Sequence, residues 1–236
     1  VYKRQPLLTS FGQRPDGPVK VLDEAESKGL LARWGVPVPA ARVVRSAGEA
    51  ATAARKLGYP VVVKALGVAH KTEVGGVKLD LGCAQEVSAA VMEMAGLSES
   101  YLIEKMVDGV VAELIVGVAR DAQFGPYLLV GGGGILVEMM KDSTSLLMPT
   151  TRERVLQALA QLKCAPLFSG FRGAPPADLN AAVDVILAVA GMLENNPSSI
   201  IELDINPLML FAEGQGVVAA DALISLNSKS ASDPGK

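Results

Sequence analysis

The chain has 236 residues, of which 50% are hydrophobic and 20% charged, enough to bury a full core in one or two compact units. Its net charge of −3 and the absence of any basic block argue against a nucleic-acid or anionic-membrane partner. Apolar runs are too short to predict a membrane span. The two cysteines, Cys83 and Cys164, form no C-x-x-C pattern, so we expect reduced thiols in a cytoplasmic protein.

Residues 1–19 are expected to lie outside the fold. The first five, Val-Tyr-Lys-Arg-Gln, resemble the translation of a sequencing adapter, and residues 6–19 carry the Pro and Gly residues typical of a linker. The chain would then be a fragment whose own N-terminus is missing. At the other end, the polar residues 227–236 are expected to form a frayed, disordered tail.

Periodicity and turn signals predict alternating helices and strands along the rest of the chain. In the first half we expect a helix ended by Gly35, an extended segment, a helix opened by the capping box of Ser46 and Glu49, and one strand. These elements cover Asp23–Trp34, 36–39, 46–57 and Val61–Ala65.

The second half is richer in strands. Helices are expected at 84–95, at 150–162 after a capping box of Thr150 and Glu153, and at 178–193. Strands are expected at 101–105, 110–118, 127–130, 135–139, 200–205 and 217–220, with Gly131 to Gly134 as a turn or a site of close backbone approach. Short links between strands favour antiparallel pairing, so the predicted class is α+β.

The stretch from Pro60 to Leu79 carries the most chemistry. Lys64 stands at a strand end, His70 is the one histidine of the sequence, and Gly75-Gly76 precedes another strand-like pair. Glycines let backbone N–H groups approach an anion, and lysine supplies a point charge, so this combination is typical of phosphate binding, although no P-loop is present. A lone histidine is ordinarily a core residue, but the polar flanks of His70 favour a nucleophile that accepts a phosphoryl group.

A second group of polar residues lies downstream. Glu202, Asp204 and Asn206 alternate along one strand, which places their oxygens on one face. Asp221 ends the next strand, which a short turn folds back alongside. Carboxylate and amide oxygens on adjacent strands suit Mg²⁺, whereas the plainer interpretation is a solvated strand face.

Glu104, Val107 and Glu113 belong to a strand, a short link and a second strand. Carboxylates in such a place can accept hydrogen bonds from ribose hydroxyls, and the linking backbone can bind an adenine edge. Taken alone the signal is weak, because acidic residues on half-buried strands are usually only solvated.

Five motifs in order carry a family resemblance that covers about residues 20–226. They are V-V-V-K-A (61–65), H-K-T-E-V-G-G-V (70–77), E-x-x-V (104–107), R-D-A-Q-F-G-P (120–126) and E-L-D-I-N-P-L (202–208). Together they resemble the ATP-grasp domain of ADP-forming acyl-CoA synthetases such as the ADP-forming acetate–CoA ligases. In two-subunit enzymes this domain is the β subunit, and it is related to the β subunit of succinyl-CoA synthetase.

The resemblance implies ATP held between a small lid, about residues 36–102, and a larger lobe, residues 20–35 and 103–226. It also assigns residue roles. Lys64 would meet the nucleotide phosphates and Gly75-Gly76 would cover them, Glu104 to Val107 would hold adenine, Glu113 the ribose, and Asn206 with Asp221 the Mg²⁺. His70 would be a phosphoryl relay, oriented by either Glu73 or Asp204. Leu66-Gly67 stand where many relatives have Ser-Pro, which affects loop rigidity more than chemistry.

The reaction implied is acyl-CoA + ADP + phosphate ⇌ acid + CoA + ATP, with ATP/ADP and Mg²⁺ bound here. A companion CoA-binding and ligase module, either an α subunit or a missing N-terminal region, would make the acyl phosphate. Two alternatives are the ATP-grasp-like module of a protein lysine acetyltransferase and a non-catalytic domain that senses nucleotide or acyl-CoA. Lys64, His70, Asn206 and Asp221 together favour an active domain.

Overall fold

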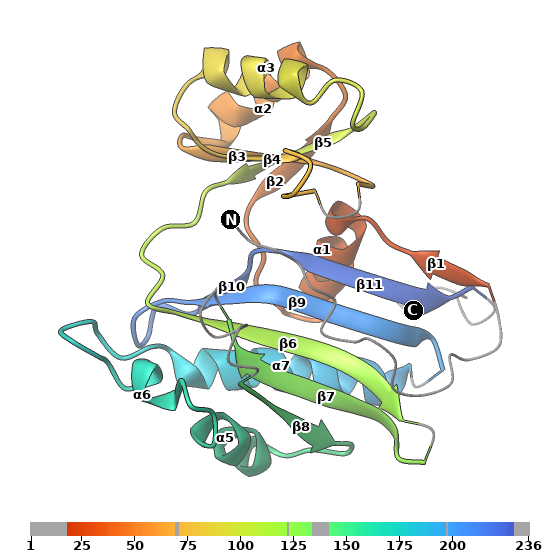
Figure 1. Ribbon diagram of the computed structural model, residues 1–236, viewed down its shortest axis with the longest axis vertical. Coiled ribbons are helices and arrows are strands. Elements are labelled where there is room, and N and C mark those ends of the chain that lie inside the picture. Colours follow the sequence, from red (N-terminus) through yellow and green to blue (C-terminus); the bar gives the residue numbers. More distant parts are fainter. Residues whose placement is uncertain (1–17, 69–70, 122, 134–141, 197, 229–236) are drawn as a thin grey trace. The chain divides into compact units, whose positions relative to one another are not determined.

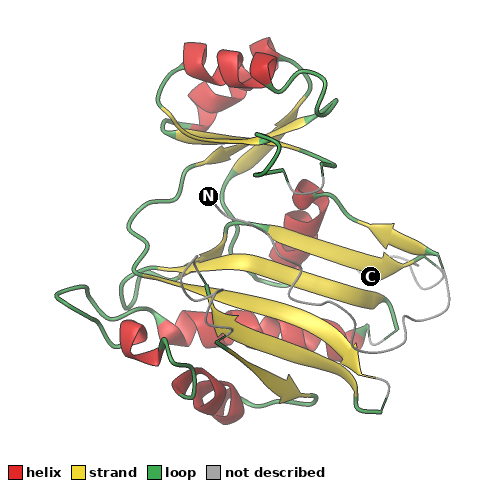
Figure 2. Ribbon diagram, in the orientation of Figure 1, coloured by secondary structure: helices red, strands yellow, loops and turns green. Residues whose placement is uncertain are grey.

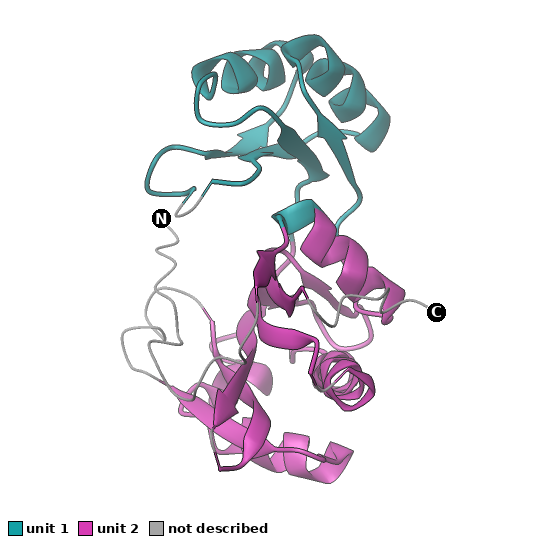
Figure 3. Ribbon diagram, turned by 90° about the vertical axis from the view of Figure 1, so that its right-hand side faces the viewer, with its two compact units in different colours: residues 1–5, 23–25, 39–108 teal, residues 6–22, 26–38, 109–236 magenta. Residues whose placement is uncertain are grey.

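The computed structural model describes residues 18–228 except 69–70, 122, 134–141 and 197. The chain divides into two compact units (Figure 3). The first comprises residues 23–25 and 39–108, and the second the segments before, between and after them. In the part of the chain so described, no helix has the length and apolar character needed to cross a membrane.

Unit 1 is a four-stranded antiparallel sheet with two helices on one of its faces (Figures 1 and 2). The strand order is β2-β5-β3-β4, and these elements are β2 (Ala41–Val44), α2 (Ala47–Leu57), β3 (Val61–Ala65), β4 (Val77–Leu81), α3 (Ala84–Glu93) and β5 (Tyr101–Lys105). Alternation along β3 turns Val61 and Val63 toward the helices, where both are fully buried. Lys64 therefore belongs to the opposite face.

Register places a second charged residue beside Lys64. On β5, Leu102 lies opposite Lys64 and Glu104 lies opposite Val62. Paired residues of an antiparallel sheet share a face, so Lys64 and Glu104 are diagonal neighbours on the side away from α2 and α3. The strands thus bring together two charges that are 40 residues apart in the chain.

Unit 2 is built on a seven-stranded sheet. Its order is β1-β11-β9-β6-β7-β8, with β10 also paired to β9, and all pairs are antiparallel. The strands are β1 (Val19–Val21), β6 (Ala112–Asp121), β7 (Gly125–Gly132), β8 (Ser143–Leu147), β9 (Ile200–Leu210), β10 (Val217–Ala219) and β11 (Ala222–Asn227). The helices are α1 (Glu24–Arg33), of which residues 24–25 belong to unit 1, α5 (Arg152–Ala160), α6 (Ala165–Phe168) and α7 (Leu179–Asn195). The predicted α+β class is confirmed.

The core of unit 2 lies between this sheet and its helices (Figure 1). Leu203 and Ile205 of β9 point into it and are fully buried, as their alternation with Glu202 and Asp204 predicts. Leu30 and Leu31 of α1 join the same cluster as the buried face of α7. Consequently α1 packs by its C-terminal half, which leaves its first turn for the polar contacts described below.

The observed N-caps of three helices test the predicted helix starts. Ser46 caps α2 by accepting a hydrogen bond from the N–H of Glu49, and Asp178 caps α7 through the N–H of Ala181, so both are confirmed. The predicted capping box at Thr150 is wrong by one residue. The cap of α5 is Thr151, whose hydroxyl accepts from the N–H of Arg154.

Strands were predicted less completely. The long strands 110–118 and 200–205 are confirmed as β6 and β9, although β6 begins at Ala112 and both strands extend further toward the C-terminus. Four strands were missed, namely β1, β2, β8 and β11, all short or interrupted by polar residues. Asn227, placed in the expected frayed tail, ends β11 and is buried. The predicted strand 135–139 lies entirely outside the described residues.

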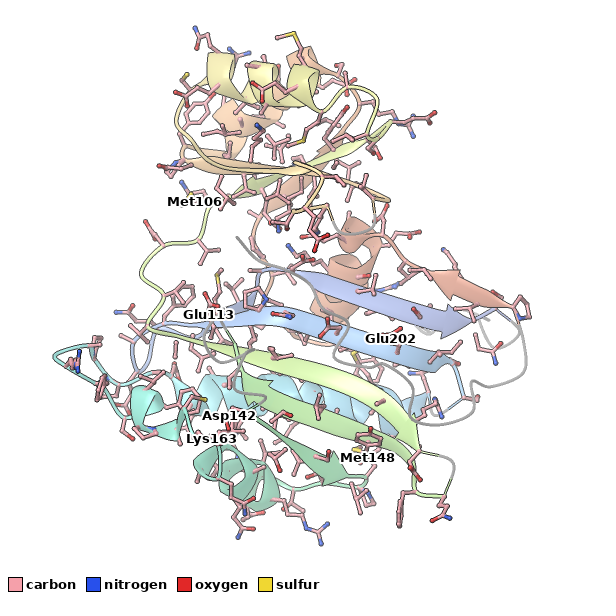
Figure 4. The ribbon with its side chains drawn as sticks, in the orientation of Figure 1. Met106, Glu113, Asp142, Met148, Lys163 and Glu202 are labelled. Carbon is pink, nitrogen blue, oxygen red and sulfur yellow. The ribbon has the colours of Figure 1, made fainter. Side chains whose placement is uncertain are left out.

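Asp142 anchors the segment before α6 in unit 2. Its two carboxylate oxygens accept hydrogen bonds from the backbone N–H groups of Lys163 and Cys164, each at 2.8 Å (Figure 4 labels Asp142 and Lys163). Burial alone raises the pKa of Asp142, but the two N–H donors, the Cys164 thiol and the charge of Lys163 together outweigh it and hold the pKa below its usual value. Burial and the nearby Asp142 carboxylate raise the pKa of Cys164 to about 12, and both cysteines are free thiols as expected.

We predict that Asp142→Ala destabilises the protein by about 1–3 kcal/mol at pH 7, because two buried N–H donors lose their acceptor. A lowered folded pKa stabilises the native state above the unfolded value of about 4, and this contribution is lost as pH falls through the folded pKa. Urea unfolding should therefore show the difference from wild type at pH 7 and its decline in acid. Glu194→Ala, at an exposed position late in α7, is the control. Equal stability of wild type and Asp142→Ala at pH 7 would show that the Asp142 carboxylate does not stabilise this segment.

Candidate functional site

Lys64 lies in a buried cluster of charges in unit 1. Its Nζ is 2.7 Å from Oε1 of Glu24 and 2.7 Å from Oε2 of Glu104, and Lys71 Nζ donates to Oε2 of Glu24. All four residues are less than 9% exposed. Lys64 is at the strand end that the sequence predicts, and its two carboxylate partners fix its ammonium on the face away from the helices.

The glycine pair closes a turn on Lys71. Gly75 has φ +75°, a value that favours glycine, and the N–H of Gly76 donates to the carbonyl of Lys71. A Cβ at Gly76 would lie 2.9 Å from that carbonyl oxygen, so a side chain does not fit. The carbonyl of Gly76 in turn accepts from the N–H of Ala65 at 2.8 Å, which ties the turn to the end of β3. The predicted phosphate-covering turn is therefore directly attached to the strand that carries Lys64.

His70 lies outside the described residues, and its role stays a prediction from sequence. Of its two candidate orienting carboxylates, Glu73 is exposed and Asp204 is half-buried on β9. The choice between them stays open.

The predicted adenine-binding link follows β5. Met106 (labelled in Figure 4) donates its N–H to the carbonyl of Pro60, and Val107 next to it is half-buried. Lys105 donates through Nζ to the carbonyls of Gly58 and Tyr59 at 3.2 and 2.8 Å. These contacts fasten the start of the link to the segment that precedes β3.

Glu113, the predicted ribose-binding residue, is half-buried on β6 of unit 2 (Figure 4). The glycine run approaches its backbone, since Gly133 N–H donates to the Glu113 carbonyl at 2.8 Å. A Cβ at Gly133 would lie 2.8 Å from Cβ of Glu113, and one at Gly131 would lie 2.9 Å from the carbonyl oxygen of Asp142. Close backbone approach, one of the two predicted roles of this run, is confirmed for these glycines, whereas Gly134 lies outside the described residues.

Asn206 and Asp221 meet where two strands are irregular. The register of β9 against β6 shifts near Asn206, and the break between β10 and β11 falls at Ala220 and Asp221. The two irregularities face each other, because Asn206 N–H donates to the Asp221 carbonyl at 3.1 Å and Ala220 N–H donates to the Pro207 carbonyl at 3.0 Å. The structure thus brings together the two residues predicted to hold the metal.

Lys28 provides a further tether to the same junction. This buried lysine of α1 donates through Nζ to the carbonyl of Ala220 at 2.6 Å, and the hydroxyl of Ser27 beside it accepts from Ile224 N–H at 3.1 Å. The first half of α1 therefore contacts the backbone on both sides of Asp221.

The donor set at this junction fits Mg²⁺. One carboxylate and one amide oxygen supply few protein ligands, as suits a cation that shares the rest of its coordination with phosphates and water. Across the described ranges no group of three or more His, Cys, Asp or Glu side chains could hold a metal ion.

Three of these residues were not predicted from sequence. Glu24 and Lys28 lie on a helix whose apolar periodicity predicts only its packing against the core. Lys71 belongs to the polar flanks of His70 and has no predicted role of its own. The available signal was the charge pattern of α1, where a core-facing helix carries Glu24 and Lys28 at i, i+4.

The ATP-grasp domain family matches residues 15–226 of the sequence. The chain belongs to this family. Its predicted ATP-grasp fold is thereby confirmed.

Proteins similar to this chain include CoA ligases and synthases. The chain is 35% identical over 215 residues to the subunit beta of acetate–CoA ligase [ADP-forming] I of Pyrococcus furiosus, covering 87% of this chain and 91% of that protein. It is 38% identical over 214 residues to a trans-feruloyl-CoA synthase from an unknown prokaryotic organism, covering 86% of this chain and 30% of that protein. The chain thus spans only about a third of the longer relatives that it matches.

The solved structures similar to this chain include an acetyl-coenzyme A synthetase. A Candidatus Korarchaeum cryptofilum dinucleotide-forming acetyl-coenzyme A synthetase 1 superposes with a TM-score of 0.77 at 32% identity, covering 88% of this chain and 93% of that one. That structure is described as a complex with coenzyme A and acetyl-coenzyme A, and with a phosphorylated phosphohistidine segment. A phosphohistidine thus occurs in a structural neighbour of this ATP-grasp domain.

Proposed function

We propose that this ATP-grasp domain is the nucleotide-binding and phosphoryl-transfer module of an ADP-forming acyl-CoA synthetase. It binds ATP or ADP with Mg²⁺ and passes a phosphoryl group between His70 and the nucleotide. The observation that carries the proposal is the match to nearly the full length of a separate acetate–CoA ligase β subunit. The buried Lys64 and the Asn206–Asp221 junction support it, because the first is an ammonium suited to phosphates and the second joins an amide and a carboxylate residue suited to Mg²⁺.

In this proposal each group of residues has its own role. Lys64 and the Gly75-Gly76 turn meet the phosphates, and Glu104 to Val107 with Glu113 bind the nucleoside. Asn206 and Asp221 hold the metal, which when bound neutralises phosphate charge. Catalysis is then a matter of positioning and charge neutralisation, as phosphoryl transfer generally requires.

A companion CoA-binding and ligase module completes the reaction in this proposal. The name "subunit beta" of the Pyrococcus furiosus relative supports a partner of this kind. The acyl group would bind in that module, and the relatives act on different acids, so this chain does not specify it. Two free cysteines suit a reducing, cytoplasmic setting.

We predict that the isolated chain binds Mg-ATP and Mg-ADP but makes no acyl-CoA. Titration calorimetry should detect binding, while an assay with acetate, ATP and CoA should detect no thioester. Lys64→Met should weaken binding about 10- to 100-fold, since a contact with a charged group is worth about 1.5–3 kcal/mol. Lys78→Met, on the neighbouring strand and 41% exposed, is the matched control.

Two results would contradict the proposal. Absence of nucleotide binding by the folded chain would remove its basis, and rapid thioester formation without a partner would show that the module is a complete synthetase. Binding without any phosphoryl transfer would instead favour the sensing alternative.

A further inference from the structure

Two ammonium groups converge on one carboxylate in unit 1. Oε1 of Glu24 receives Lys64 Nζ at 2.7 Å, and Oε2 of the same carboxylate receives Lys71 Nζ. The exposed fractions are 6% for Glu24, 8% for Lys64 and 7% for Lys71. Each oxygen of a buried anion is therefore matched to its own lysine.

Stability alone does not account for this arrangement. Among the described residues, the ion pairs join two lysines to two glutamates, Glu24 and Glu104, so the formal charges of these four side chains cancel. Buried ion pairs carry a large desolvation cost and are often no more stable than an apolar replacement. An anion held by two lysines in a shielded place is, in contrast, the environment that a phosphoryl group requires.

Lys71 is held in place at both ends. Its carbonyl accepts the N–H of Gly76, and the absence of a Cβ at Gly76 permits this approach. Its side chain ends on Glu24. The turn that was predicted to cover the phosphates therefore presents a second ammonium beside Lys64.

We propose that Lys64 and Lys71 together form a binding site for one phosphoryl group, and that Glu24 is the internal counter-ion that competes with this group for both lysines. The proposal rests on the proposed nucleotide-binding function and adds Lys71 and Glu24 to it. A nucleotide phosphate displaces the Glu24 carboxylate and takes over its two ammonium contacts. Glu104 remains paired with Lys64, so the site never holds two uncompensated lysines.

The direction in which a Glu24 substitution changes phosphate affinity distinguishes a competing counter-ion from a residue that only supports the two lysines. Replacing Glu24 by Gln keeps the size of the side chain and removes the competing charge, so the site gains one net positive charge. Phosphate-bearing ligands should then bind more tightly, by about tenfold for a change of about 1.4 kcal/mol. A residue that merely held the two lysines in place would weaken binding when replaced.

Calorimetry on the full chain tests this with Mg-ADP and with adenosine as probes. Glu24→Gln should bind Mg-ADP about tenfold more tightly and adenosine unchanged. Lys71→Met should weaken Mg-ADP binding and leave adenosine binding unchanged, which keeps the proposal testable if Glu24→Gln does not fold. Glu26→Gln, on the same helix but exposed and paired with Lys20, is the matched control.

The outcomes are distinguishable. Tighter Mg-ADP binding by Glu24→Gln together with weaker binding by Lys71→Met supports the proposal. Weaker or unchanged Mg-ADP binding by a folded Glu24→Gln, or unchanged binding by Lys71→Met, overturns it while leaving the nucleotide-binding function intact. If wild type itself binds no Mg-ADP, the proposed function fails first.

Discussion

Asp221→Asn is expected to weaken Mg-ATP binding by about 10- to 100-fold, the loss for one contact to a charged group worth about 1.5–3 kcal/mol. The variant keeps the shape of the side chain and removes the charge that would bind the cation. The backbone contact between Asn206 N–H and the Asp221 carbonyl does not depend on that side chain, so the junction should keep its structure. Asn206→Ala should act in the same direction.

Titration calorimetry with Mg²⁺ and with a chelator measures this effect. The difference between wild type and Asp221→Asn should be large with Mg²⁺ and small without it, since only the metal-dependent part of binding is lost. Glu213→Gln, exposed on the nearby turn between β9 and β10, should bind like wild type. Equal metal-dependent affinity in wild type and both site variants would exclude Asn206 and Asp221 as the metal ligands.

Local signals in the sequence predicted the helices well. The cap at Ser46 and the helix start at Asp178 were predicted because such signals depend only on residues a few positions apart. The shift from Thr150 to Thr151 shows the limit of this signal, because two adjacent threonines offer the same hydroxyl. Backbone geometry decides between them, and the sequence does not.

The missed strands share a different cause. β8 reads S-T-S-L-L and β2 reads A-R-V-V, so neither has the sustained alternation that predicts a strand. Each becomes a strand because a longer neighbour provides hydrogen-bond partners, β7 for β8 and β5 for β2. This context is tertiary and is absent from a local pattern.

In the candidate site, too, local features were predicted from the sequence and tertiary contacts were not. The pairing of Asn206 with Asp221 was predicted because a short turn separates their strands. The Glu24–Lys64–Lys71–Glu104 cluster was not, because it depends on strand register and on a helix that lies 40 residues before Lys64. The sequence motifs identified residues typical of the family. The structure was needed to show which charged side chains pair with them.

His70→Asn is expected to abolish phosphoryl transfer to the protein while leaving nucleotide binding unchanged. A carrier that returns its phosphoryl group to ADP needs a bond of high transfer potential, which the P–N bond of phosphohistidine has and an oxygen ester lacks. The attacking nitrogen must be unprotonated, and an unperturbed histidine pKa of about 6.5 allows this at pH 7. Asparagine has similar polarity but no such nucleophile.

Labelling with γ-labelled ATP and Mg²⁺ tests the central claim most directly. The wild-type chain should acquire a label that is labile in acid and stable in base, and added ADP should remove it as labelled ATP. His70→Asn, shown by calorimetry to bind ATP as wild type does, should acquire none. A label that persists in His70→Asn, or a wild-type chain that binds Mg-ATP and takes no label even with a companion module present, would contradict the phosphoryl-relay function.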